Sequence, residues 1–305
     1  MQSQKCKVES IDITTSHFAL STFYFLLCTF DFALPFMSIL EPLTLVFMQR
    51  GLAAGMLVAV ACGLLGCFVV LRGMEYIGDA IAHSVFPGVV ISYAIGSSLL
   101  LGGLVAGLAT ALLISVLNRG GKLKDSTTIG VVFTGALALG VLLMSVLRGS
   151  TRDLSHFLFG NILGVNDSDL IFTGILALVV FVCVILFYKE LTLSSFDPTH
   201  ARKIGIPVNS LRTGLLILLT LTIVAGAQSV GVLLVTALLI TPAATASLLS
   251  RRLPRMIGIA SGLAVTSVFI GLYASYFFDV SSGAAIVLVV TIYFLIAWLF
   301  VSKRY

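Results

Sequence analysis

The stretch GDAIAHSVFPGV, residues 78 to 89, places an aspartate and a histidine in a run of otherwise apolar residues. Asp79 and His83 are four residues apart, and this spacing puts two side chains on the same face of a helix, about one turn from each other. A carboxylate and an imidazole together are suitable ligands for manganese, iron or zinc. The pair therefore predicts a metal site on one helix face.

The depth of this pair in the membrane bears on its role. If a helix continues from Arg72, a rise of 1.5 Å per residue puts Asp79 about 10 Å and His83 about 16 Å beyond that arginine. Ionisable groups inside a bilayer cost about 2.5 to 3.5 kcal/mol each on insertion scales, which points to function. The alternative is that Asp79 caps the helix and hydrogen-bonds to His83. Two ligands do not close a metal site, so a second copy of the chain or other groups must supply the rest.

The elements that hold the pair are membrane spans. Of the 305 residues, 59% are hydrophobic and 10% are charged, with a mean hydropathy of +1.13, whereas about 25% of residues are charged in soluble domains. A helix needs about 20 apolar residues to cross a bilayer. The sequence predicts an all-α, polytopic transmembrane helical bundle of nine spans, near residues 51–71, 77–96, 98–118, 128–148, 168–188, 212–228, 230–250, 256–278 and 283–301.

Basic residues set the expected orientation. If Lys303 and Arg304 are cytoplasmic, the loops on that side and the C-terminal tail hold 13 of the 18 Lys and Arg, which is the bias of positive-inside insertion. We therefore expect a multi-pass protein of the plasma (inner) membrane, surrounded by lipid, with a cytoplasmic C-terminus. The same bias accounts for the net charge of +5 without a nucleic-acid partner.

The longest loop predicted on the cytoplasmic side covers residues 189–212. Asp197 can cap a helix that has Pro198 in its first turn, and Gly205 can end that helix after about two turns. With Phe196 at one end and Arg202 alongside, this short helix can dock into a groove on a soluble partner. A capped surface helix without a partner is the alternative.

Two further segments limit the chemistry. The glycine-lysine cluster NRGGKLKD, residues 118–125, lacks the glycine spacing and the hydroxyl residue of a phosphate-binding P-loop, so ATP hydrolysis is expected in another chain. On the opposite side of the membrane, RDLSHFLFGNIL contains Asp153 and His156. This segment is interpreted as an amphipathic interfacial helix. The alternative is an external docking surface or a site that receives the metal before it enters the pore.

Four blocks of the chain resemble one known family, the membrane permeases of ABC transporters that import manganese, zinc or iron, called ABC-3. The likeness covers about residues 37–301, in order and with matching spacing. The blocks are MQRGLAAGMLVAVACGLLGCFVVLRGMEYIGDAIAHSVFPGVVISY (48–93), DLSHFLFGNIL (153–163), SFDPTHARKIGIP (195–207) and GVLLVTALLITPAATA (231–246).

The resemblance implies a subunit that is not itself an enzyme. It implies half of a homodimeric pore, supplied by an extracytoplasmic metal-binding lipoprotein and driven by a pair of cytoplasmic ABC ATPase subunits. On matching positions, Asp79 and His83 become metal ligands, and the segment from Phe196 to Ile206 becomes the helix that couples to the ATPase. No permanent cofactor is implied, only the transported divalent ion.

The identity of that ion stays open at this point. The blocks are more similar to the manganese systems, so manganese is the expected cargo, with zinc or iron as the alternatives. A different class, a proton-coupled secondary metal transporter, would need several facing carboxylates and repeated broken helices. The chain offers Asp79, with Glu75 and Asp279 near helix ends. Such a carrier has no use for an ATPase-docking helix, so the 189–212 loop distinguishes the two classes.

Residues 1–36 have no counterpart in the resemblance. They contain a short apolar run with Asp31, which is interpreted as a dispensable extension or a mis-assigned start. A tenth helix or a signal-like segment are the alternatives. Met37 opens the stretch before the first strong span, so residues 37–305 are expected to form the permease domain.

Expression from Met37 should therefore support metal uptake as well as the full chain does, because all nine predicted spans and both motifs lie downstream. The measurement is uptake of labelled manganese, normalised to protein in the membrane. A truncated chain that is inserted but inactive would show that residues 1–36 form a necessary helix.

Overall fold

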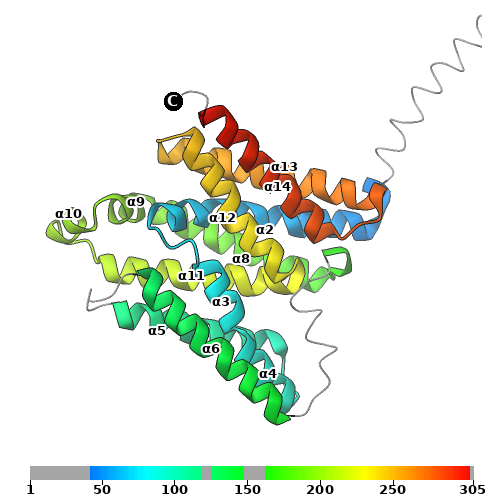
Figure 1. The fold of residues 1–305 in the computed structure, drawn as a ribbon, viewed down its shortest axis with the longest axis horizontal. Helices are drawn as coiled ribbons and strands as arrows, with labels where there is room; N and C mark the ends of the chain where they lie inside the picture. Colours follow the sequence, from blue (N-terminus) through cyan, green and yellow to red (C-terminus); the bar gives the residue numbers. More distant parts are fainter. Residues whose placement is uncertain (1–41, 119–124, 148–161, 303–305) are drawn as a thin grey trace, which may run out of the picture. The chain divides into compact units, whose positions relative to one another are not determined.

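The computed structural model describes residues 42–118, 125–147 and 162–302. Within these ranges nine helical spans are long and apolar enough to cross a membrane, which confirms the predicted all-α bundle (Figure 1). One compact unit begins at Phe47 and contains these spans apart from the first residue of the first one.

The spans are connected by short turns or, between α8 and α11, by a pair of small helices wherever the connection lies within the described residues. The elements are α2 (Val46–Leu71), α3 (Ile77–Ser84), α4 (Phe86–Ile95), α5 (Leu99–Asn118), α6 (Asp125–Leu147), η1 (Ile162–Gly164), α8 (Asp167–Leu186), α9 (Tyr188–Phe196), α10 (Pro198–Lys203), α11 (Val208–Ser229), α12 (Val232–Leu249), α13 (Leu253–Phe278) and α14 (Ser282–Ser302).

The second predicted span is confirmed as Ile77–Ile95, and within it Val85 alone separates α3 from α4. Pro87 stands in the first turn of α4, where its missing N–H is tolerated, although the same residue inside a helix would remove a hydrogen bond to the carbonyl of His83. The sequence predicted residues 77–96 as one continuous helix. The proline four residues after His83 was the available signal for this boundary.

The helix assumed between Arg72 and Asp79 is not present. Residues between Arg72 and Ile77 form a turn, with Gly73 at a φ of +64°, so no helix runs from the arginine to the aspartate. Measured along α3, Asp79 lies only about 3 Å and His83 about 9 Å beyond Ile77. The pair therefore occupies the first two turns of a short helix that starts after a tight turn.

Close backbone contacts hold α2 inside the bundle. A Cβ on Gly66 would collide with the carbonyl oxygen of Leu239 in α12, and one on Gly63 would come within 2.8 Å of the Ser261 Cα in α13. Helices in membranes associate through such small residues because no hydrophobic effect drives one apolar helix against another. By contrast, α6, α8 and α14 leave most of their apolar side chains exposed, as expected for helices that contact lipid.

Replacing Gly66 with alanine should lower the free energy of unfolding by about 1 to 3 kcal/mol, because the new methyl group must displace backbone rather than a flexible side chain. Thermal unfolding of the purified protein in detergent measures this change. Gly262→Ala is the matched control, since nothing in the structure lies within 4 Å of a Cβ at Gly262. Equal melting temperatures for the two variants would contradict the assigned contact.

Candidate functional site

The packing of α3 decides which of its faces stays open. Ile77 and Ile81 are fully buried, and Gly78 lets α3 approach α12, because a Cβ there would lie 3.1 Å from Leu239 and 3.7 Å from Thr236. With this side of α3 covered, Asp79 is exposed and His83 is half-buried on another side. The i, i+4 pair predicted from the sequence therefore shares one accessible helix face.

That face borders a pocket of about 500 Å³ between α3 and the first turns of α6. Polar groups from both helices meet there, and the α6 side is open at Gly130, where an added Cβ would have no atom within 4 Å. The lining residues are Tyr76, Asp79, Ala80, His83, Ser126, Thr127, Ile129, Gly130 and Phe133.

Neither side chain of the pair is engaged elsewhere in the described part of the chain. The N-cap of α3 is Tyr76, and no side chain caps the helix. No hydrogen bond or ion pair of Asp79 or His83 occurs among the described side chains; the His83 ring lies 5.6 Å from that of Phe133. The alternative in which Asp79 caps α3 and bonds to His83 is thus not what the structure shows.

One copy of the described chain does not complete a metal site. No group of three or more His, Cys, Asp and Glu side chains that could hold an ion occurs in the described ranges. Within the pocket, the donors besides Asp79 and His83 are hydroxyls, from Ser126 and Thr127 among others. Transition metals prefer imidazole and carboxylate, so any further strong ligand must come from outside these residues.

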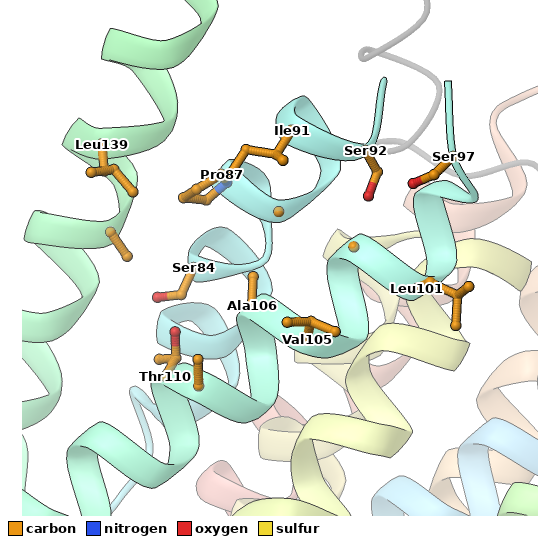
Figure 2. Close-up of a pocket in the computed structure, with 14 residues that line it drawn as sticks. Ser84, Pro87, Ile91, Ser92, Ser97, Leu101, Val105, Ala106, Thr110 and Leu139 are labelled. Atoms are coloured by element: carbon orange, nitrogen blue, oxygen red, sulfur yellow. The ribbon is translucent and has the colours of Figure 1, made fainter. Parts of the chain in front are cut away.

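A second pocket lies on another side of the same span, bordered by α4, α5 and α6 (Figure 2). Its volume is about 510 Å³, and its lining is mainly apolar. The Ser84 hydroxyl, in the same region as Thr110 in Figure 2, is buried and has no hydrogen-bond partner in the described part of the chain. Without a carboxylate or an imidazole, this pocket does not offer ligands for a transition metal.

The local structure predicted around Asp197 is confirmed. Its Oδ1 accepts hydrogen bonds from the backbone N–H groups of Thr199 (3.0 Å) and His200 (2.8 Å), which caps α10 with Pro198 in the first turn. Gly205 has a φ of +89°, a conformation that glycine adopts without strain. The sequence did not predict α9, which makes the preceding residues a helix rather than a loop.

Arg72 ties α9 to the turn before α3. Its Nη2 donates to the Ser194 hydroxyl at 2.7 Å, and its Nε donates to the Ser195 hydroxyl at 3.0 Å. Burial lowers the pKa of Arg72 to about 10, and the nearby Arg212 acts in the same direction while Asp125 opposes it. This pKa is still well above neutral, so the guanidinium stays charged and keeps all its donors.

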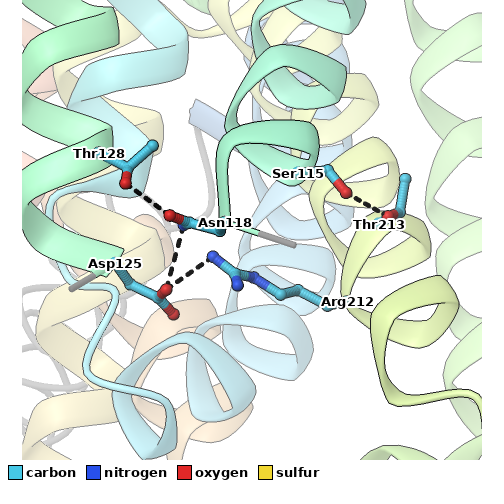
Figure 3. Close-up of polar contacts among 6 residues, drawn as sticks. All are labelled: Ser115, Asn118, Asp125, Thr128, Arg212 and Thr213. Atoms are coloured by element: carbon cyan, nitrogen blue, oxygen red, sulfur yellow. Dashed lines mark hydrogen bonds and ion pairs between the residues drawn. The ribbon is translucent and has the colours of Figure 1, made fainter. Parts of the chain in front are cut away.

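A second polar network joins α5, α6 and α11 (Figure 3). Arg212 donates to Asp125 Oδ1 at 2.8 Å, and the Asn118 amide donates to the same oxygen at 3.1 Å. The Asn118 oxygen in turn accepts from the Thr128 hydroxyl. Because Asp125 begins α6, this network fixes the start of the helix that lines the pocket beside Asp79.

The remaining predicted site residues, Asp153 and His156, lie outside the described residues. The contacts of Arg72 and Arg212, in contrast, were not predicted, because the sequence indicated these arginines only as markers of membrane topology. Their partners are more than 80 residues away along the chain, so no local pattern indicates them.

Comparison with known proteins defines the class. Residues 44–301 match the profile of the ABC 3 transport family, and the chain belongs to this family. It is therefore a multi-pass membrane component of an ABC transport system, and the resemblance found in its sequence is confirmed.

Individual relatives refine this picture. The chain is 48% identical over 258 residues to the manganese transport system membrane protein MntC of Listeria monocytogenes, covering 85% of this chain and 92% of that one. It is 39% identical to a probable iron transport system membrane protein of Haemophilus influenzae, covering 85% and 95%. Among solved structures, PsaBC from Streptococcus pneumoniae in complex with Fab matches with a TM-score of 0.75 and 39% identity, covering 86% and 95%.

Proposed function

We propose that this chain is the pore-forming permease subunit of an ATP-driven importer for a divalent transition metal, with manganese as the cargo. The observation that carries the proposal is the Asp79–His83 pair, two metal-ligand side chains that share one open helix face and have no other polar partner among the described residues. The names of the relatives favour manganese, and iron or zinc is the alternative cargo of the same architecture.

The pair needs more ligands, and a second copy of the chain is the source we propose. The face formed by Asp79, Ser126 and Thr127 is exposed, and an ion held between two such faces would receive two carboxylates and two imidazoles. This set of oxygen and nitrogen donors suits manganese, iron and zinc. The transported ion is cargo, so no permanent cofactor is proposed.

The end of the bundle that carries α9 and α10 is proposed to be cytoplasmic, together with the C-terminus, because the basic loops gather there. The Phe196 side chain, at the end of α9, is 58% exposed, and Arg202, on the capped helix α10, is exposed as well. An exposed aromatic and an exposed charge on consecutive short helices suit docking into a groove of an ATPase subunit. Asp197, Pro198 and Gly205 shape this docking helix.

At the opposite side of the membrane, an extracytoplasmic metal-binding protein is proposed to deliver the ion. Asp153 and His156 are the residues proposed to contribute to its docking. ATP hydrolysis is assigned to the separate cytoplasmic subunit, in keeping with the absence of a P-loop sequence.

The metal role of the pair predicts that Asp79→Asn and His83→Ala abolish manganese uptake. Asparagine keeps the size of the side chain but removes the negative charge that binds the cation, and alanine removes the nitrogen donor. Uptake of labelled manganese and of labelled zinc, normalised to protein in the membrane, measures the effect. The loss should exceed about 100-fold, beyond what weakening of a single outer contact causes.

Asp279→Asn is the matched control for this experiment. Asp279 has a φ of +52°, a conformation that asparagine also adopts readily, so this variant should transport normally. Wild-type uptake by Asp79→Asn would overturn the ligand assignment, because asparagine could serve as a helix-capping residue but not as an anionic ligand.

The docking role of the α9–α10 segment predicts that replacing Phe196 and Arg202 with alanine weakens ATPase capture on the order of tenfold. An aromatic side chain that becomes buried on docking, together with a charged group, usually dominates such contacts. Co-purification of the ATPase subunit from detergent measures capture. Phe278→Ala is the control, because this phenylalanine is 77% exposed at the end of α13, away from α10. Equal capture by both variants would reject the docking assignment.

A further inference from the structure

Charged side chains connect the two walls of the metal pocket either to the α9–α10 segment or to α11, the helix that follows it. The pocket has one wall from α3 and one from α6. Arg72, in the turn before α3, is hydrogen-bonded to α9. Asp125, at the start of α6, is hydrogen-bonded to Arg212 of α11, the helix that follows α10. These contacts are separate from the residues assigned above to metal binding and to ATPase docking.

The first tie leads to the α3 wall. Arg72 follows the last residue of α2 and begins the turn that ends at Ile77, the start of α3. Both hydroxyls that its guanidinium contacts, those of Ser194 and Ser195, belong to the last turn of α9. A displacement of α9 would therefore move the short turn between α2 and α3. Asp79 is two residues beyond Ile77, the first residue of α3, so it would move with this turn.

The second tie leads to the α6 wall. Arg212 stands in the first two turns of α11, which follows α10 after a short connection. Its partner Asp125 is the first residue of α6, directly before the pocket-lining Ser126 and Thr127. Asn118 holds the same carboxylate oxygen, so the start of α6 is clamped between α11 and the end of α5 (Figure 3).

The two ties belong to one cluster of charges. Arg212 and Asp125 form an ion pair at 2.8 Å, and, in addition to burial, both affect the pKa of Arg72, which Arg212 lowers and Asp125 raises. The side chains of Arg212 and Asp125 are only 17% and 33% exposed, and the Arg212 Nε is buried without a hydrogen-bond partner among the described residues. Loss of Asp125 would thus leave a largely buried cation unpaired, which is strongly unfavourable.

We propose that Arg72 and Arg212 are positioning residues that transmit movement of the ATPase-docking segment to the two walls of the metal pocket. The ties stay formed during transport, so that α3 and α6 move with α9 and α11 when the ATPase closes and opens. This inference rests on the proposed docking role of α9–α10, and it adds the residues that convert docking into a change at the metal pair.

The test uses the full complex in proteoliposomes, with the permease, its ATPase and the metal-binding protein, and records manganese transported per ATP hydrolysed. Arg72→Ala and Arg212→Ala should lower this ratio about tenfold, within the range usual for coupling between two sites. ATPase capture should be unchanged in both variants. Asp167→Asn is the matched control, because it breaks the 2.7 Å ion pair between Asp167 and Arg50. This ion pair lies near the starts of α2 and α8, at the other end of α2 from Arg72. The control should leave the ratio at the wild-type value.

Two further variants, which keep both arginines, keep the test decisive if an arginine variant fails to insert. The double variant Ser194→Ala with Ser195→Ala removes both acceptors of Arg72 without removing a charge. Asp125→Asn removes the ion pair with Arg212 but keeps an oxygen that can accept hydrogen bonds from Arg212 and Asn118. Both should show the same loss of transport per ATP. A wild-type ratio in either variant overturns the corresponding tie.

The outcome also separates this inference from the docking proposal. If Phe196→Ala loses the ATPase while the tie variants transport normally, docking stands and the ties are rejected. If Phe196→Ala and Arg202→Ala keep the ATPase, the docking role itself is rejected. A reduced ratio in the tie variants together with normal ATPase capture supports the complete path from α9 to Asp79.

Discussion

The close approach of α3 to α12 is the constraint on which the candidate site depends. Gly78 has no side chain, so α3 can lie against Leu239 and Thr236, and the helix period then leaves Asp79 and His83 on an accessible face. The same stretch of α12 receives Gly66 of α2. A single region around Leu239 thus fixes both α2 and the orientation of Asp79 and His83.

The polar contacts are concentrated instead at the end of the bundle that carries α9 and α10. Arg72, Arg212 and Asp125 hold four helices there through side-chain bonds. Inside a bilayer such groups are expensive, whereas at its edge they can be charged and still partly buried. Small residues therefore set the spacing between helices within the membrane. Charged side chains join the helices and turns at the end of the bundle that carries α9 and α10.

The sequence predicted the number of spans, the capped α10 and the shared face of Asp79 and His83, because each follows from a local pattern of apolar length, cap residues or helical spacing. It did not predict the break at Val85, for which Pro87 was the available signal, or the helix α9, whose mixed polar and apolar sequence YKELTLSSF shows no clear periodicity. The helix assumed to run from Arg72 to Asp79 is interrupted by the turn at Gly73. The Arg72 and Arg212 contacts join distant parts of the chain, which no single-sequence pattern encodes.

The shortness of α3 has a mechanical consequence. Eight residues make little more than two turns, and Asp79 and His83 span half of that length, so their side chains belong to one short helical unit that begins after the turn at Gly73 and ends at Val85. Such a unit can tilt without changing the separation of its own two donors. In the proposed homodimer, the ion would then be released by parting two intact half-sites, and its affinity would be governed by the gap across the symmetry axis.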